Sequence, residues 1–213
     1  MTRVVKALGT GERPGQNMLS LIPGEELAYR NEIAPIGTQS YAASVLACRA
    51  ALRAVDARGE PWAGVGYSLG AAGLGDFVVL DRPKHCLGIV LIADPLRARG
   101  QCANPVAADR WGVAGERPIS GVPLRSFAIP DDPITSCPGD NGMRLFANTV
   151  TGRQQPIQPR MLWDAGYTLA WFFRYLKQDS RHIVYGTERM PGDSRTYVEA
   201  ARDAVNELAG GSK

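Results

Sequence analysis

The stretch Gly66-Tyr67-Ser68-Leu69-Gly70 is the most informative part of this 213-residue chain. Residues 61–66 before it are mostly apolar and predict a short strand, and residues 69–80 after it predict a helix rich in alanine and glycine. A G-x-S-x-G sequence between a strand and a helix forms a tight turn that presents the serine hydroxyl at the edge of a sheet. The flanking glycines lack the Cβ atoms that would clash there. Ser68 is therefore the candidate nucleophile, and the Leu69 N–H is a candidate donor to an oxyanion.

Segments that predict strands alternate with segments that predict helices along the rest of the chain. The run from Leu87 to Ile92 is continuously apolar, which is typical of a strand buried on both faces. We expect an α/β fold with a doubly wound, mainly parallel sheet, helices on both faces and no large separate cap. The length predicts one domain over residues 1–213, with a helical aromatic insertion at about 138–178. The predicted strands are 2–8, 29–33, 61–66, 85–93 and 124–129, and the predicted helices are 40–58, 69–80, 143–149, 161–177 and 195–208.

Charge and hydropathy argue against two classes of partner. The net charge is only +3 and the basic residues form no runs, so we expect no binding to nucleic acid. No apolar stretch approaches the roughly 20 residues that a membrane-spanning helix needs. The sequence from Met1 to Lys6 leads directly into a predicted strand without the features of a secretory signal. We therefore expect synthesis in a cytoplasm without a signal peptide.

Cysteine and histidine usage gives no sign of a metal site. The four cysteines show no Cys-x-x-Cys spacing and the chain has only two histidines, which argues against zinc. We expect no metal and no cofactor. Reduced thiols are the simplest interpretation, although one disulfide can form after release from the cell. The cysteines are Cys48, Cys86, Cys102 and Cys137.

Of the two histidines, one is suitably placed to act as a base for Ser68. In an open parallel sheet, functional groups gather at the carboxyl ends of the strands. His85 precedes its predicted strand and should lie at the opposite edge, whereas His182 lies in a late loop before the last helix. The order serine, acid, histidine is one in which such triads occur. We therefore predict that His182 is the general base.

Three aspartates follow predicted strands and are candidates for the acid that orients His182. Asp132 is favoured because it follows the second strand after the serine turn, the usual position of this acid. Asp94, after the intervening strand, is the main alternative, and its simpler role is to cap or hydrogen-bond neighbouring loops. Asp131 is a third candidate.

The predicted helix over residues 161–177 contains the densest group of aromatic residues in the chain. An amphipathic helix of this kind usually packs its aromatic face onto the core. Alternatively, part of it lines an apolar groove for an acyl chain beside Ser68. The candidates for that groove are Trp163, Tyr167, Trp171 and Phe172.

Three motifs together resemble those of the cutinase-like serine esterases. They are Gly66-Tyr67-Ser68-Leu69-Gly70, Asp132-Pro133-Ile134 followed by Cys137, and His182-Ile183-Val184-Tyr185-Gly186. Within that group, the chain is most similar to the lysin B enzymes of mycobacteriophages. The resemblance implies an α/β-hydrolase with a Ser68, Asp132, His182 triad, and it implies that Thr10 in the Gly9-Thr10-Gly11 turn supplies the second oxyanion donor.

The resemblance also implies a substrate and a place of action. Lysin B enzymes cleave the ester that joins mycolic acids to arabinogalactan, so a lipid ester of the mycobacterial envelope is the expected substrate and phage-driven host lysis the expected role. Such an enzyme would be made in the host cytoplasm and act at the cell envelope after release. The alternatives are a general cutinase-like esterase or lipase, an acyltransferase, or a binding module whose catalysis has decayed.

Overall fold

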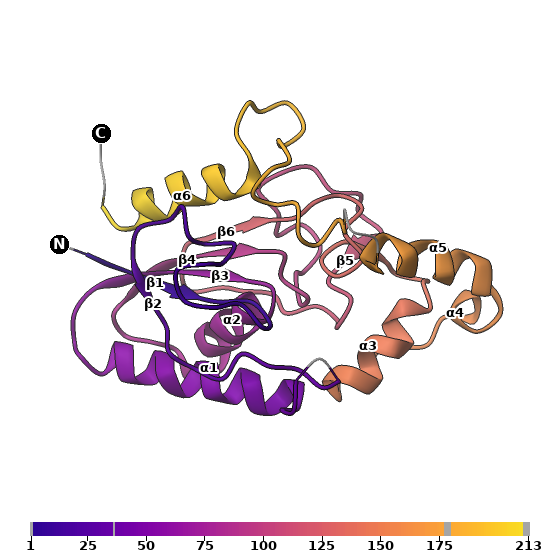
Figure 1. Ribbon diagram of the computed structural model, residues 1–213, viewed down its shortest axis with the longest axis horizontal. Helices are drawn as coiled ribbons and strands as arrows, with labels where there is room; N and C mark the ends of the chain where they lie inside the picture. Colours follow the sequence, from indigo (N-terminus) through magenta and orange to yellow (C-terminus); the bar gives the residue numbers. More distant parts are fainter. Residues whose placement is uncertain (1, 36, 177–179, 211–213) are drawn as a thin grey trace.

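The computed structural model describes residues 2–35, 37–176 and 180–210, and its centre is a five-stranded parallel sheet. The strand order is β2-β1-β3-β4-β6, so the strand that ends at the serine turn lies in the middle of the sheet. Helices α1 and α2 cover one face and α6 covers the other (Figure 1). The predicted doubly wound α/β fold is thereby confirmed. The strands are β1 (Arg3–Ala7), β2 (Glu25–Glu26), β3 (Trp62–Tyr67), β4 (Cys86–Ile92) and β6 (Leu124–Phe127), and the helices are α1 (Tyr41–Asp56), α2 (Leu69–Asp81) and α6 (Tyr197–Leu208).

The sheet is held by apolar side chains on both faces, because its central strands alternate between two cores. In β3, Val65 and Tyr67 pack into the cluster under α6, whereas Trp62 packs into the cluster under α1 and α2. In β4, Ile92 lies on the first side and Leu91 on the second. Successive side chains of a strand point to opposite faces, so a strand between two helical layers must be apolar at every position.

The predicted strand over residues 29–33 was wrong. The strand in this region is β2 at Glu25–Glu26, and the later segment bonds to the loop after β1 instead of to a sheet. Tyr29 donates its hydroxyl hydrogen to the carbonyl of Leu8, and the side-chain amide of Asn31 donates to the carbonyl of Gly9. The hydrogen bonds of this segment hold a turn beside the serine.

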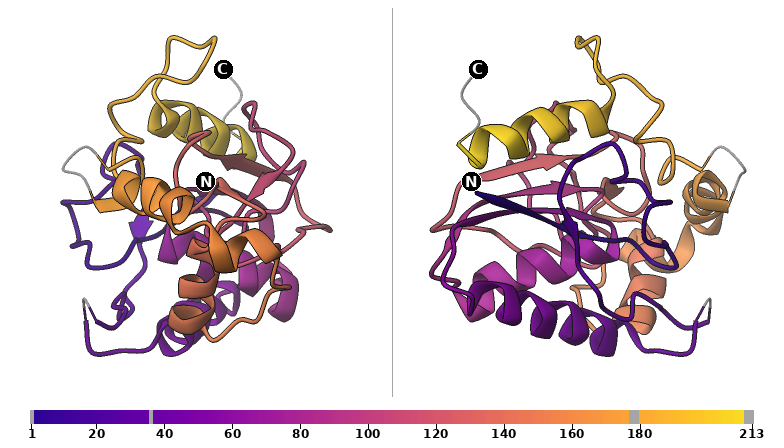
Figure 2. Two further views of the ribbon diagram at one scale, coloured as in Figure 1. Left: turned by 90° about the vertical axis from the view of Figure 1, so that its right-hand side faces the viewer. Right: turned by 60° about the vertical axis from the view of Figure 1, so that its left-hand side comes forward.

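The aromatic segment was predicted as one helix over residues 161–177, and within the described residues it is two. Helix α4 (Pro159–Trp163) ends at Asp164 and α5 (Ala165–Leu176) begins directly after it, while residue 177 lies outside the described part. The break occurs because the Asp164 carboxylate accepts the N–H of Tyr167 at 2.9 Å and so caps the second helix. Together with α3 (Met143–Thr151), these helices gather at one end of the molecule (Figures 1 and 2).

Two smaller features complete the described structure. A short antiparallel pair, β5 (Arg110–Trp111) with β7 (Cys137–Pro138), lies beside α3 and is linked to it by Arg144, whose guanidinium donates to the carbonyls of Trp111 and Cys137. All four cysteines are free. Among the helices described, none has the length and hydropathy required to cross a membrane.

Candidate active site

Ser68 occupies a strained turn between β3 and α2. Its backbone φ of 53° and ψ of −115° lie in a region that residues other than glycine rarely adopt. The turn fits between its neighbours only because Gly66 and Gly70 flank the serine. A Cβ atom on Gly70 would lie 2.0 Å from the carbonyl oxygen of Ala7, and one on Gly66 would lie 2.8 Å from the Ala71 Cα. The packing therefore requires glycine at both positions, as the sequence predicted.

The structure brings Ser68, His182 and Asp132 together at the carboxyl edge of the sheet. The Ser68 Oγ lies 2.8 Å from the His182 Nε2, and the His182 Nδ1 lies 2.9 Å from the Asp132 Oδ2. Strand β4 separates β3 from β6, so the acid follows the second strand beyond the serine turn. In this arrangement the imidazole can accept the serine proton on one nitrogen while the carboxylate holds the other N–H.

Asp132 is fully buried, and its two carboxylate oxygens have separate partners. Oδ1 accepts the N–H of Ile134 at 2.9 Å, and Oδ2 accepts the hydroxyl of Tyr185 at 2.7 Å in addition to its contact with His182. Burial raises the pKa of Tyr185 well above its ordinary value, as does the nearby Asp132 charge, so the hydroxyl stays a donor. These hydrogen bonds fix the plane of the carboxylate.

His182 is held from the loop that follows α5. Its carbonyl accepts the hydroxyl of Tyr67, and its ring stacks on the Tyr67 ring with centroids 5.6 Å apart and planes at 24°. Tyr175 approaches the imidazole from α5, with centroids 6.1 Å apart. The residue before the nucleophile and the end of the aromatic helix thus both contact the histidine.

The other sequence candidates for acid and base lie elsewhere. Asp94 is buried and forms an ion pair with Arg117 at 2.7 Å, and it caps its own loop by accepting the Leu96 N–H. Asp131 is partly exposed and pairs with Arg181 at 2.7 Å. The carbonyl of His85 accepts the N–H of the first residue of β3, so this histidine lies at the edge opposite Ser68, as predicted.

The two candidate oxyanion donors come from neighbouring elements. Leu69 is the first residue of α2, and the first N–H groups of a helix have no partner within the helix. Thr10 lies in the turn after β1, the strand that pairs with β3 on the side away from Asp132. Gly9 of the same turn is so close to Tyr67 that a Cβ atom there would lie 2.6 Å from its ring. Both donors therefore lie in segments adjoining Ser68.

The four aromatic residues considered for an acyl groove have different environments. Trp171 is buried in a cluster with Cys137 and Met143, and Tyr167 and Phe172 pack against that cluster. Trp163 is 71% exposed. The aromatic residue of this segment that contacts the histidine is Tyr175, which the sequence did not single out. The groove itself stays a prediction.

Besides Tyr175, three other residues at this site were missed. Tyr185 is part of the motif that begins at His182, and Tyr67 is part of the serine turn. A tyrosine hydroxyl so near each catalytic candidate in the sequence was a signal that could have identified both residues. Glu12, directly after the Gly9 to Gly11 turn, accepts the N–H of Gly9 at 2.6 Å. Its burial raises the pKa of this carboxyl, although hydrogen bonds from Met18 and Gly9 act in the opposite direction.

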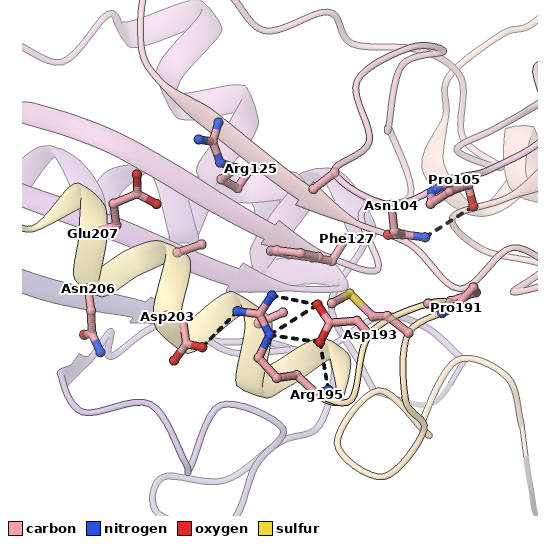
Figure 3. A pocket seen from close by; sticks show the side chains of 15 residues that line it. Asn104, Pro105, Arg125, Phe127, Pro191, Asp193, Arg195, Asp203, Asn206 and Glu207 are labelled. Atoms are coloured by element: carbon pink, nitrogen blue, oxygen red, sulfur yellow. Dashed lines mark hydrogen bonds and ion pairs between the residues drawn. The ribbon is translucent and has the colours of Figure 1, made fainter. Parts of the chain in front are cut away.

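A separate hollow of about 910 Å³ lies between the edge strand β6 and α6, away from Ser68. Figure 3 shows Phe127 beside a network in which Arg195 lies between Asp193 and Asp203. None of Ser68, His182 and Asp132 is among its lining residues. This hollow is therefore distinct from the serine site.

Comparison with known proteins identifies the fold. No protein-family model and no curated protein matches the sequence. The crystal structure of lysin B from Mycobacteriophage D29 is similar, with a TM-score of 0.54 and 18% identity over 97% of this chain and 98% of that one. A cutinase-like protein from Cryptococcus sp. is similar with a TM-score of 0.52 and 16% identity, over 100% of this chain and 97% of that one. The chain therefore shares the α/β-hydrolase fold of these two proteins.

Proposed function

We propose that the protein is a serine esterase that hydrolyses carboxylic esters with Ser68 as nucleophile. The observation that supports this most strongly is the pair of contacts through His182, 2.8 Å to the Ser68 Oγ and 2.9 Å to the Asp132 Oδ2. A serine in a strained turn, hydrogen-bonded to a histidine that a buried carboxylate holds, has the geometry of an activated nucleophile.

In the proposed reaction, the Ser68 Oγ attacks the ester carbonyl carbon as its proton passes to the His182 Nε2. The carbonyl oxygen becomes an oxyanion, which accepts hydrogen bonds from the N–H groups of Leu69 and Thr10. The C–O bond to the alcohol then breaks, and the imidazolium donates its proton to the departing oxygen. Water attacks the acyl-enzyme by the same route in reverse, which releases the carboxylic acid and restores the Ser68 hydroxyl.

We further propose that the ester is a lipid ester of the mycobacterial envelope, joining mycolic acid to arabinogalactan, and that the enzyme acts there after release during phage-driven lysis. The sequence motifs that resemble lysin B support this, as does the likeness of fold to lysin B from Mycobacteriophage D29. An exposed apolar side chain beside the site is consistent with a lipid substrate, since Ile183, the residue after His182, is exposed.

The second candidate is a cutinase-like esterase of general specificity, which the likeness to the Cryptococcus protein supports equally. Two assays separate the possibilities. Turnover of p-nitrophenyl butyrate by the wild type, lost in Ser68→Ala, establishes an esterase. Release of free mycolic acid from isolated mycobacterial cell wall by the same protein establishes the envelope substrate, whereas turnover of the small ester without that release favours the general esterase.

A further inference from the structure

The turn that carries Thr10 is held by the carboxylate of Glu12, the residue directly after Gly9-Thr10-Gly11. Glu12 Oε2 accepts the N–H of Gly9 at 2.6 Å, and Oε1 accepts the N–H of Met18 at 2.7 Å. One side chain thus ties the start of the turn to the loop beyond it. Hydrogen bonds to an ionised acceptor are among the stronger ones in proteins, so this bridge restricts the turn more than a neutral side chain would.

Asn31 holds the same turn from outside. Its side-chain amide donates to the backbone carbonyl of Gly9 at 2.6 Å and to that of Glu12 at 2.9 Å. The backbone carbonyl of Asn31 accepts the N–H of Gly11 at 2.8 Å. Asn31 therefore contacts both ends and the middle of the turn. Residues 29–33, which were predicted as a strand, instead hold the turn after β1 by hydrogen bonds.

Three of the backbone N–H groups in and directly after the turn have acceptors. The N–H of Gly9 goes to the Glu12 carboxylate, that of Gly11 to Asn31, and that of Glu12 to the Gly9 carbonyl at 3.3 Å. Thr10 is different, since its N–H has no acceptor among the described residues, and Thr10 is only half-buried. The turn is thus rigidly held while one of its donors stays available.

We infer that Glu12 and Asn31 are positioning residues that hold the Thr10 N–H ready for the oxyanion. The inference rests on the proposed function and deepens it. A donor lowers the barrier only if it already points at the site where charge develops, because turning a loose backbone towards the oxyanion costs free energy at that moment. The close contact of Gly9 with Tyr67 sets the distance of the turn from Ser68, and the two side chains set its orientation.

The test compares Glu12→Ala, Glu12→Gln and Asn31→Ala with wild type on p-nitrophenyl butyrate, with rates expressed per active site titrated by a phosphonate ester. Removal of one oxyanion donor typically lowers kcat about 100- to 1000-fold, so a misplaced donor should lower it by roughly 10- to 100-fold with little change in KM. Glu12→Gln keeps one acceptor oxygen and should fall between Glu12→Ala and wild type. The rate of phosphonylation should fall in parallel, because that adduct also develops a charged tetrahedral oxygen.

Glu199→Gln is the matched control. Glu199 also accepts a backbone N–H, that of Thr196 at 2.7 Å, but it does so at the start of α6. This variant should lower the melting temperature and leave kcat per titrated site unchanged. If Glu12 and Asn31 only stabilised the fold, their variants would behave in the same way. The fraction of active protein would fall, and kcat per titrated site would not change.

Unchanged kcat per site in both Glu12→Ala and Asn31→Ala would overturn the inference, as would an equal loss in Glu199→Gln. Failure of the proposed function looks different, because wild type itself would then neither turn over the ester nor react with the phosphonate.

Discussion

The Tyr185 hydroxyl donates to the Asp132 Oδ2 at 2.7 Å, and this is the oxygen that lies 2.9 Å from the His182 Nδ1. The same hydroxyl accepts the N–H of Ile129 at 3.0 Å, and the Tyr185 side chain is fully buried. One phenol therefore joins the histidine loop to the chain that follows β6. It couples the stability of this edge of the sheet to the orientation of the acid.

Tyr185→Phe should destabilise the protein and weaken catalysis together. The ring still fills its site, but the Ile129 N–H loses its acceptor and Asp132 loses a donor, a cost of about 1 to 3 kcal/mol. Urea unfolding measures the loss of stability, and kcat for p-nitrophenyl butyrate measures the effect on the acid. Wild-type values for both would mean that the hydroxyl has no role at this site.

Asp132→Asn and Asp94→Asn should have opposite profiles. The amide introduced by Asp132→Asn would favour the wrong imidazole tautomer, so kcat should fall by roughly three to four orders of magnitude. The Asp94→Asn change would weaken the buried pair with Arg117, so its main effect should be a lower melting temperature. Asp131→Asn, at a partly exposed ion pair, should affect either property little. A larger fall in kcat for Asp94→Asn than for Asp132→Asn would assign the acid to the neighbouring strand.

Much of the fold could be predicted because the central strands have to be apolar on both faces. Both Asp132 and Asp94 follow strands. The sequence favoured Asp132 as the acid because its strand is the second after the serine turn. The break between α4 and α5 was missed because it depends on one hydrogen bond from Asp164 within a continuous amphipathic pattern. Tyr185 and Asp132 are 53 residues apart, and their contact arises only when two loops meet at the sheet edge. No local sequence pattern predicts the contact between these two residues.

Trp171→Ala and Trp163→Ala compare a buried with an exposed member of the aromatic segment. The first should cost about 3 to 5 kcal/mol by leaving a cavity beside Met143, whereas the second should leave the melting temperature nearly unchanged. Esters of increasing chain length then test the groove. A loss of kcat/KM that grows with chain length in Trp163→Ala, at unchanged stability, supports an acyl-binding role, and a uniform profile in both variants opposes it.

The thiols should be unreactive in the native protein. Burial raises the pKa values of Cys48, Cys86 and Cys137 to about 12, and it raises that of Cys102 as well. The thiolate fraction at pH 8 is then small, so Ellman's reagent should react slowly until the pH approaches these values. Unfolding in urea without reductant should expose all four thiols at once. Two reactive thiols in place of four would reveal a disulfide.

Covalent labelling with a fluorophosphonate determines whether Ser68 is a nucleophile activated by His182. A fluorophosphonate should add once to the native wild type, on the peptide that contains Ser68. It should not add to Ser68→Ala, it should add far more slowly to His182→Ala, and it should add at the wild-type rate to His85→Ala, whose histidine lies at the opposite edge of the sheet. Mass spectrometry of the intact protein and of its peptides gives the number and site of adducts. Absence of an adduct on native wild type, or an equal rate for His182→Ala and wild type, would mean that Ser68 is not a nucleophile activated by His182.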